Sequence, residues 1–331
     1  MLNGHGDDRY QFDKKIIADF SSNVYYEGLS AGLKQQLTGS LDKLNNYPEV
    51  NAKSLQQALA AWHSLTPAQV LVTNGATEAF YLVAHAYRNK SATILIPAFA
   101  EYEDACKAND ITVQYLTEIQ DFYSTDLVFF GNPNNPTGAV LPTALIINIL
   151  KTNPDTVFVI DEAYVDFTKE KISMVTHLSD FSNLIIIRSL TKTYSIPGLR
   201  LGYLLSNAGI IHHILPYKMP WSVNALAIEA GLYISQHKNS LPLDTLLYDT
   251  KELMQSLSQY VTVFDSHTNF FLCHTDKGDA ADLKLFLINE GVLIRDAANF
   301  KSLNAGHFRI ATQTRGKNAL LIKLIEAWIN G

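Results

Sequence analysis

Short runs of apolar residues alternate with segments of helical periodicity along the first two thirds of the chain. Seven apolar runs lie at residues 70–73, 92–96, 111–116, 126–130, 156–160, 183–188 and 200–205. Between them, apolar residues recur at helical spacing over residues 76–88, 102–109 and 142–152. Short apolar strands separated by helices are typical of a mainly parallel sheet that is covered on both faces. The pattern therefore predicts an α/β fold with a mostly parallel seven-stranded sheet between helices.

The pattern changes after about residue 222. Two long helical segments come first, at 223–238 and 244–260. Strand-like runs at 261–265, 269–275, 292–296 and 307–312 follow, with helical segments at 282–291 and 317–328. This order predicts a second, smaller α+β domain. We expect a large domain at residues 36–240 and a small domain made of residues 1–35 and 241–331, because the N-terminal segment contains little that could join the parallel sheet.

Charge and composition argue against several classes of protein. The 331 residues carry 26 lysines and arginines against 32 aspartates and glutamates, a net charge of −6 that argues against nucleic-acid or anionic-membrane binding. No apolar run approaches the roughly 20 residues of a membrane span, and no signal peptide is readable. Two cysteines, Cys106 and Cys273, are too few for a disulfide framework or a cysteine metal site. We therefore expect a cytoplasmic protein without a bound metal.

Polar segments directly follow several predicted strands, which is where ligands bind in parallel α/β sheets. In TNGATE, Gly75 allows a tight turn and leaves the N–H groups of Ala76 and Thr77 free at a helix start, a geometry that binds phosphate. An ordinary strand–glycine–helix connection is the simpler explanation of this turn taken alone. In GNPNNPTG, Asn135 is a candidate hydrogen-bond donor in a rigid loop, although turn building alone explains the glycines and prolines.

Two further segments add an acid and a lysine. In DEAYVDF, Asp161 ends a strand that is buried on both sides and needs a partner there, and Tyr164 could reach the same strand end. A surface acid at a strand end is the alternative. In RSLTKTYSIPGLRLGY, Lys192 follows another buried strand among hydroxyl side chains, eight residues before Arg200. An acid, a lysine, amide donors and a phosphate-type turn thus converge on one edge of the sheet.

One cofactor chemistry uses all of these parts, namely pyridoxal phosphate bound as a Schiff base to a lysine. A carboxylate opposite the pyridine nitrogen keeps the ring protonated, so that the ring accepts electrons from the substrate Cα. Amide and phenol donors stabilise the O3′ oxygen, while a helix N-terminus, hydroxyls and an arginine hold the phosphate. The segments together predict a pyridoxal-phosphate site.

The same motifs resemble those of the class I/II aminotransferases, which are fold-type I pyridoxal-phosphate-dependent transferases. NPNNPTG, DEAYVDF and SLTKTYSIPGLRLGY follow in that family's order and approximate spacing, and the resemblance covers essentially the whole chain. It implies that Lys192 is the Schiff-base lysine, that Asp161 is the partner of the pyridine nitrogen, and that Asn135 and Tyr164 are ligands of O3′. The other implied cofactor contacts are the turn at Gly75 with the phosphate ligands Ala76, Thr77, Ser189, Thr191 and Arg200, and Phe99 stacked on the ring.

The resemblance also implies a partner and a substrate. Tyr47 is similar to the tyrosine that reaches the cofactor phosphate of a neighbouring subunit, which implies a homodimer with shared active sites. Arg309 is similar to the arginine that binds the substrate α-carboxylate, a surface arginine on an edge strand being the alternative. The chain resembles the branch of histidinol-phosphate aminotransferases and threonine-phosphate decarboxylases. Three terminal segments look closer to the decarboxylases: GHGDDRY, DFSSNV and GVLIRDAANFKSLNAGHFRIATQTRGKN.

These terminal segments imply further substrate contacts. Asn23, in DFSSNV, is a candidate substrate ligand. Arg295, in LIRD, is a candidate for a substrate's distal phosphate, because a guanidinium suits bidentate binding of that group. A salt bridge at the end of a strand explains Arg295 equally well.

The sequence does not decide which reaction is catalysed. The cofactor labilises whichever Cα bond stands perpendicular to its ring, so the same residues serve transamination, with Lys192 moving the proton, or decarboxylation. We hypothesise an aminotransferase-type enzyme, similar to histidinol-phosphate aminotransferase, that acts on a small phosphorylated amino compound. Threonine-phosphate decarboxylation is the alternative, and a non-catalytic pyridoxal-phosphate-binding module is a remote third hypothesis.

Overall fold

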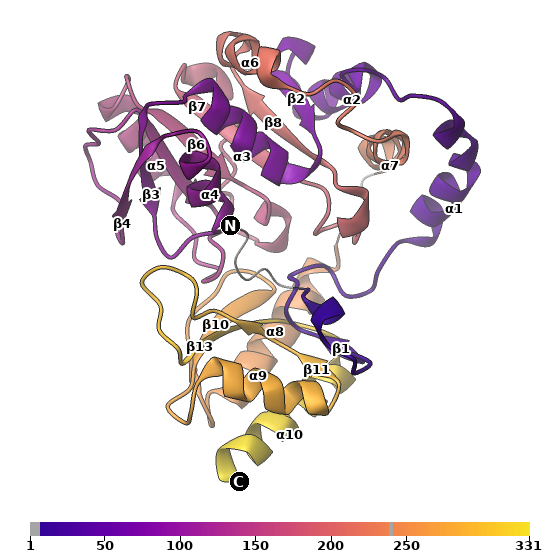
Figure 1. Cartoon of the computed structure of the whole chain (residues 1–331), viewed down its shortest axis with the longest axis vertical. Coiled ribbons are helices and arrows are strands. Elements are labelled where there is room, and N and C mark those ends of the chain that lie inside the picture. Colours follow the sequence, from indigo (N-terminus) through magenta and orange to yellow (C-terminus); the bar gives the residue numbers. More distant parts are fainter. Residues whose placement is uncertain (1–6, 238–240) are drawn as a thin grey trace.

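Seven strands form the sheet of the large domain in a computed structural model that describes residues 7–237 and 241–331 (Figure 1). Their order is β2-β8-β7-β6-β5-β3-β4. Their bounds are β2 (Val70–Thr73), β3 (Ser91–Leu95), β4 (Thr112–Leu116), β5 (Leu127–Gly131), β6 (Val157–Asp161), β7 (Leu184–Ser189) and β8 (Gly202–Ser206). β8 runs antiparallel to both neighbours, and the other neighbouring strands are parallel. The predicted mostly parallel seven-stranded sheet is therefore confirmed.

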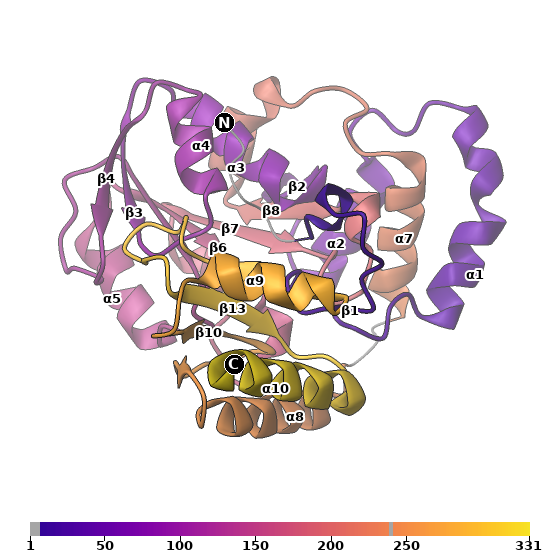
Figure 2. The same cartoon turned by 60° about the horizontal axis from the view of Figure 1, so that its bottom comes forward.

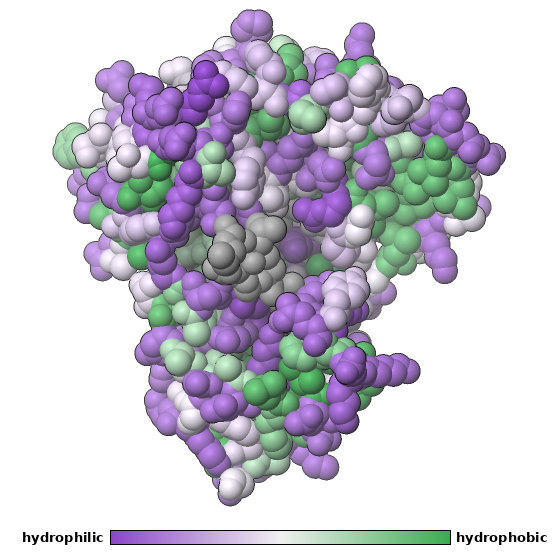
Figure 3. All heavy atoms as spheres, in the orientation of Figure 1, coloured by the Kyte–Doolittle hydropathy of each residue, from purple (hydrophilic) through white to green (hydrophobic). Residues whose placement is uncertain are grey.

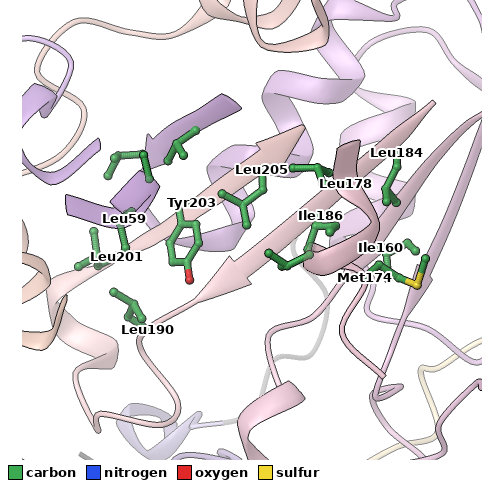
Figure 4. Close-up of a cluster of buried hydrophobic side chains, with 14 of the residues drawn as sticks. Leu59, Ile160, Met174, Leu178, Leu184, Ile186, Leu190, Leu201, Tyr203 and Leu205 are labelled. Carbon is green, nitrogen blue, oxygen red and sulfur yellow. The ribbon is translucent and has the colours of Figure 1, made fainter. Parts of the chain in front are cut away.

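Helices cover both faces of this sheet. One face carries α1 (Ala31–Gly39), α2 (Lys53–His63), α5 (Thr143–Thr152) and α7 (Ala225–Gln236). The other carries α3 (Gly75–Ala86), α4 (Glu101–Lys107) and α6 (Ala208–Ile214). Successive strand residues point to opposite faces, so Ile160 and Ile186 pack in the first apolar cluster (Figure 4), whereas Val159 packs in the second.

The small domain lies below the large sheet in Figure 1 and combines both ends of the chain. Its antiparallel sheet has the order β12 (Arg295–Asp296), β13 (His307–Ala311), β10 (Phe270–His274) and β9 (Thr262–Val263). A parallel pair joins β1 (Ala18–Asp19) to β11 (Val292–Leu293). Helices α8 (Leu243–Leu257), α9 (Ala280–Asn289) and α10 (Arg315–Asn330) complete this domain around one apolar core (Figure 2).

The chain crosses between the two domains twice, once before and once after the residues that form the large domain. The N-terminal segment packs with the small domain at β1, and α1 already packs against α7 of the large domain. The predicted boundary near residue 240 falls at residues 238–240, which lie outside the described residues, as do residues 4–6 of the GHGDDRY segment. Among the described helices, none has both the length and the apolar character needed to cross a membrane.

Candidate active site

A cavity of about 890 Å³ lies between the two domains, at the carboxyl ends of the parallel strands. The pairing register puts Gly131 opposite Asp161 and Asp161 opposite Ile187, so the ends of β5, β6 and β7 meet at this edge. The predicted site residues that line the cavity are Ala76, Thr77, Phe99, Asn135, Asp161, Tyr164, Ser189, Thr191, Lys192, Arg200, Arg295 and Arg309. The volume falls in the range of small-molecule sites.

One group of residues at the cavity has the composition of an anion-binding cradle. Gly75 opens α3 at φ +75°, and a Cβ atom there would lie 2.8 Å from Nη2 of Arg200, so a side chain at this position would displace the guanidinium. The N–H groups of the first turn, from Ala76 and Thr77, have no intrahelical acceptor and carry the positive end of the helix dipole. The Ser189 and Thr191 hydroxyls, 2.8 Å apart, line the same cavity. The cradle thus combines helix N–H groups, hydroxyls and an arginine.

Asp161 supplies a buried carboxylate to the lining of the cavity. Its Oδ2 accepts a hydrogen bond of 2.7 Å from the Tyr102 hydroxyl, and its Oδ1 accepts one of 2.9 Å from the Ala163 N–H group. Burial raises the pKa of Asp161 to about 6, although these hydrogen bonds and the Lys192 charge act in the opposite direction. A cationic N–H donor in the cavity would therefore stabilise this carboxylate.

Arg309 is buried in β13, between β12 and β10, and is not on an edge strand. Its Nη1 donates to Oδ1 of Asn135, and its Nη2 donates to the carbonyl of Ser21. Burial lowers the pKa of Arg309 to about 10. The small domain thus presents a guanidinium to the cavity beside an amide of the large domain, which fits recognition of a carboxylate.

Arg295 lines the cavity from β12. Its Nη2 donates a hydrogen bond of 2.8 Å to Oδ1 of Asn299, and its guanidinium lies 5.2 Å from the centre of the Phe300 ring. Burial lowers the pKa of Arg295. A second buried guanidinium therefore stands in the same cavity as Arg309, and the two can hold two separate anionic groups.

Asn23 is fully buried between two cavity-lining residues, Ser22 and Val24. Its backbone has φ +54°, and neither polar atom of its side chain has a hydrogen-bond partner within the described part of the chain. Buried amides are almost always hydrogen-bonded, so an unpartnered one beside a cavity points to a ligand.

Tyr47 does not line this cavity. It follows the short 3₁₀ helix η2 (Leu41–Asn45) on the outer surface, where its side chain is 85% exposed and its ring lies 5.3 Å from that of Trp221. The structure of one chain therefore does not bring Tyr47 to the other predicted site residues.

The comparisons with known proteins agree with this geometry. The family model for aminotransferase class I and II matches residues 15–327. The chain belongs to this family. It is 31% identical to threonine-phosphate decarboxylase of Salmonella typhimurium, over 95% of this chain and 92% of that protein. It is 33% identical to histidinol-phosphate aminotransferase of Caldanaerobacter subterraneus subsp. tengcongensis, over 86% and 84% of the two chains.

One solved structure is similar to this chain over nearly its whole length. L-threonine-O-3-phosphate decarboxylase from Porphyromonas gingivalis superposes with a TM-score of 0.92 at 38% identity, covering 95% of this chain and 100% of that chain. The predicted resemblance and the predicted fold class are confirmed. Membership of the family also identifies the chain as a pyridoxal-phosphate-dependent enzyme.

Several residues in or next to the cavity of this chain were not predicted. Tyr102, the partner of Asp161, lies in α4 three residues after Phe99, and the two rings pack with their centroids 5.9 Å apart. That spacing was the available signal. Glu101 and Lys301 also line the cavity. Lys301 lies on the loop after β12, and its Nζ is 3.4 Å from Oε1 of Glu103, which joins the small domain to α4.

Proposed function

We propose that this chain holds pyridoxal phosphate in the cavity and acts on a small, phosphorylated amino compound. The observation that carries the proposal is that a buried carboxylate, Asp161, and a lysine, Lys192, line one cavity together with the residues of the anion cradle. Pyridoxal phosphate supplies an electron sink that weakens the bonds at the Cα atom of a bound amino compound. The residues fit its groups: Asp161 the ring nitrogen, the cradle its phosphate, and Phe99 its ring face.

Lys192 would hold the cofactor and move protons. Its Nζ would be the amine that binds the cofactor covalently and later acts as a base and an acid at the substrate carbon. Its main chain is fixed, because the Lys192 carbonyl accepts a 3.0 Å hydrogen bond from the Tyr25 N–H group. Tyr164 and Asn135 lie in the same cavity and would orient the cofactor by hydrogen bonds to its phenolic oxygen.

The two buried guanidiniums would bind the substrate at two points. Arg309 would hold an α-carboxylate and Arg295 a distal phosphate, with Asn23 as a further polar contact. Buried guanidiniums pair with anions by charge-assisted, bidentate hydrogen bonds. A substrate with two anionic groups could engage both guanidiniums, whereas one with a single anionic group could engage only one, and this favours a phosphorylated compound.

The reaction has two candidates. Transamination, of the kind that the name histidinol-phosphate aminotransferase describes, needs Lys192 to remove and return a proton at the substrate carbon. Decarboxylation is favoured by a specific observation, the 38% identity and TM-score of 0.92 to the Porphyromonas gingivalis threonine-phosphate decarboxylase. Single-turnover spectroscopy with threonine phosphate and with histidinol phosphate distinguishes them. Conversion of the bound cofactor to its amine form indicates transamination, and CO₂ release without that conversion indicates decarboxylation. An inert spectrum with both compounds contradicts the proposal.

The role of Arg295 can be tested by comparing phosphorylated and unphosphorylated forms of one compound. We expect Arg295→Gln to raise the KM for the phosphorylated form by about 10- to 100-fold, the usual worth of a charge-assisted hydrogen-bond pair. The kcat/KM for the unphosphorylated form should hardly change, because the distal contact is missing there already. Steady-state kinetics on both forms measures the split. Equal losses on the two forms would assign Arg295 a structural role.

We also propose a homodimer in which Tyr47 serves the partner's cavity. Apolar side chains gather over the α1 region at the right of the molecule (Figure 3). Several large exposed side chains extend this surface, namely Leu41, Leu44, Tyr47, Val50, Met219 and Trp221. The segments that carry them are joined by a 3.0 Å hydrogen bond from the Trp221 N–H group to the Val50 carbonyl. Exposed apolar surface of this kind marks an interface between proteins.

Mixed dimers test the shared site directly. Tyr47→Ala and Lys192→Ala should each lower activity when every subunit carries the change. If Tyr47 acts in the partner's cavity, co-expression of the two variants restores about a quarter of the wild-type activity, because half of random dimers are mixed and each holds one intact site. Tyr248→Ala, another exposed tyrosine, is the matched control and should keep full activity. No recovery in purified mixed dimers would contradict the shared site.

A reducing compartment such as the cytoplasm is our proposal for where the enzyme works. Both cysteines, Cys106 and Cys273, are unpaired and buried. Burial raises the pKa of both thiols, which keeps them protonated and unreactive.

A further inference from the structure

A buried ion pair lies behind the candidate active site, on the opposite face of the large sheet. Glu162 follows Asp161 directly, and Arg188 precedes Ser189 directly. Successive strand residues alternate between faces. Asp161 and Ser189 therefore line the cavity, whereas Glu162 and Arg188 lie on the face of the first apolar cluster.

The pair is closely surrounded by hydrogen bonds. Oε2 of Glu162 lies 2.9 Å from Nε of Arg188 and accepts a 2.9 Å hydrogen bond from the Ser173 hydroxyl. Oε1 of Glu162 accepts a 2.7 Å hydrogen bond from the Met174 N–H group. Nη2 of Arg188 donates a 2.9 Å hydrogen bond to the same Ser173 hydroxyl. Glu162, Arg188 and Ser173 thus form a closed triangle of charged and polar contacts.

The contacts continue to the lysine segment. Nη1 of Arg188 lies 3.9 Å from Oδ1 of Asp166, and Oδ2 of Asp166 accepts a 3.1 Å hydrogen bond from the Thr193 hydroxyl. Asp166 stands two residues after Tyr164, and Thr193 follows Lys192 directly. The network therefore connects the segments that carry Asp161, Tyr164, Ser189 and Lys192 without itself entering the cavity.

We propose that Glu162 and Arg188 are positioning residues that hold Asp161 and Lys192 at a fixed separation across the ends of β6 and β7. This inference rests on the proposed function of the cavity. Stability alone does not explain the pair, because a buried ion pair adds little that two well-packed apolar side chains would not add. Directed bonds differ from apolar packing in fixing orientation, and a misplacement of about 1 Å can cost a reaction about 100-fold.

The pair also shapes the electrostatics at Asp161. The Glu162 charge raises the pKa of Asp161, while the Tyr102 hydroxyl, the Ala163 N–H group and Lys192 lower it. Arg188 lies against the Glu162 charge, and Asp166 and the Tyr203 phenol of β8 also face Arg188. Removal of Arg188 takes away the cation of Glu162 and leaves this carboxylate, beside Asp161, with hydrogen bonds from Ser173 and Met174 alone. The Asp161 pKa should then rise further, which shifts the pH profile of the site.

Three variants separate positioning from mere stability. Arg188→Met leaves the buried Glu162 carboxylate without its cation, and this variant is expected to unfold at a lower temperature than wild type. The double variant Glu162→Met/Arg188→Met replaces the pair by apolar side chains and should regain that stability. Arg188→Lys keeps the charge and loses the bond to Ser173. Asp249→Asn is the control, because Asp249 forms a 2.9 Å ion pair with Arg315 in the small domain, away from the cavity.

Positioning predicts that the double variant folds well and works poorly. We expect kcat about 10- to 100-fold below wild type with a nearly unchanged KM, partial recovery in Arg188→Lys, and no change in Asp249→Asn. Reaction of the cofactor-free protein with an amine-acylating reagent gives a readout that does not need activity. Peptide mass spectrometry should show Lys192 labelled at least about three times faster in the double variant, because the lysine segment is released. Labelling of Lys301 should stay constant.

A folded double variant with wild-type kcat and wild-type Lys192 labelling would overturn the inference. Failure of the proposed function would look different, since the wild-type protein itself would then show no cofactor absorbance and no turnover. In that case the labelling rates alone still decide whether the pair positions Lys192.

Discussion

Replacing Lys192 with alanine should lower turnover by at least roughly 1,000-fold, because in the proposed function this one side chain would supply both the covalent attachment and the proton transfer at the substrate carbon. The same change should remove the visible absorbance of the lysine-bound cofactor. Lys192 is partly buried in a cavity together with Asp161, Arg200 and Arg309, and among the described residues the one other lysine that lines the cavity is Lys301, on the small-domain loop. Absorbance spectra and steady-state kinetics on the same preparation measure both effects.

Two controls make the Lys192 result specific. Lys192→Arg keeps the positive charge and most of the volume, but it does not react with an aldehyde at neutral pH, so it should lose activity nearly as fully. Lys151→Ala removes an exposed lysine of α5 on the outside of the sheet and should behave as wild type. Unchanged absorbance in Lys192→Ala would mean that another group holds the cofactor.

The large sheet could be predicted from the sequence because its strands are short, apolar and separated by amphipathic helices. The direction of β8 could not. Its residues, Gly202–Ser206, are as apolar and buried as those of β7, and burial on both faces produces the same pattern in a parallel and an antiparallel strand. The two-residue strand β1 could not be predicted for another reason. So short a segment has no periodicity, and it is a strand only because it pairs with Val292 and Leu293.

The candidate site was predictable where a residue lies at or just beyond the carboxyl end of a strand. Asp161 and Ser189 are the last residues of β6 and β7, Lys192 follows β7 closely, and parallel strands bring their carboxyl ends together. Tyr102 lies in α4, and its bond to Asp161 depends on how α4 packs over β5 and β6. The pairing of Glu162 with Arg188 depends on β6 and β7 being neighbours, which the order of elements along the chain does not determine.

Replacing Asp161 with asparagine should lower kcat by at least roughly 100-fold, because an amide cannot offset a positive charge on the ring nitrogen of the cofactor. The volume hardly changes, so the cavity should keep its shape. The Asp161→Glu variant keeps the charge and displaces it, and its partial activity would separate the effect of charge from that of position. Single-turnover rates of the loaded variants measure the loss, and a wild-type rate in Asp161→Asn would contradict the assignment.

The same substitution should change how the cofactor-free protein responds to pH. Burial raises the pKa of Asp161 from its ordinary 3.8 to about 6 in the folded chain, so the folded state binds this proton more tightly than the unfolded state. The stability that comes from this proton is complete below about pH 4 and is lost as the pH rises through 6. A shift of this size corresponds to about 3 kcal/mol of unfolding free energy. Asparagine stays neutral, so between pH 4 and 7 wild type should lose up to about that amount relative to Asp161→Asn, as measured by urea unfolding at each pH. If the unfolding free energies of the two proteins changed with pH in the same way, burial would not raise the pKa of Asp161 in the cofactor-free protein. A protonated ring nitrogen would then not be stabilised more by this carboxylate than by an exposed one.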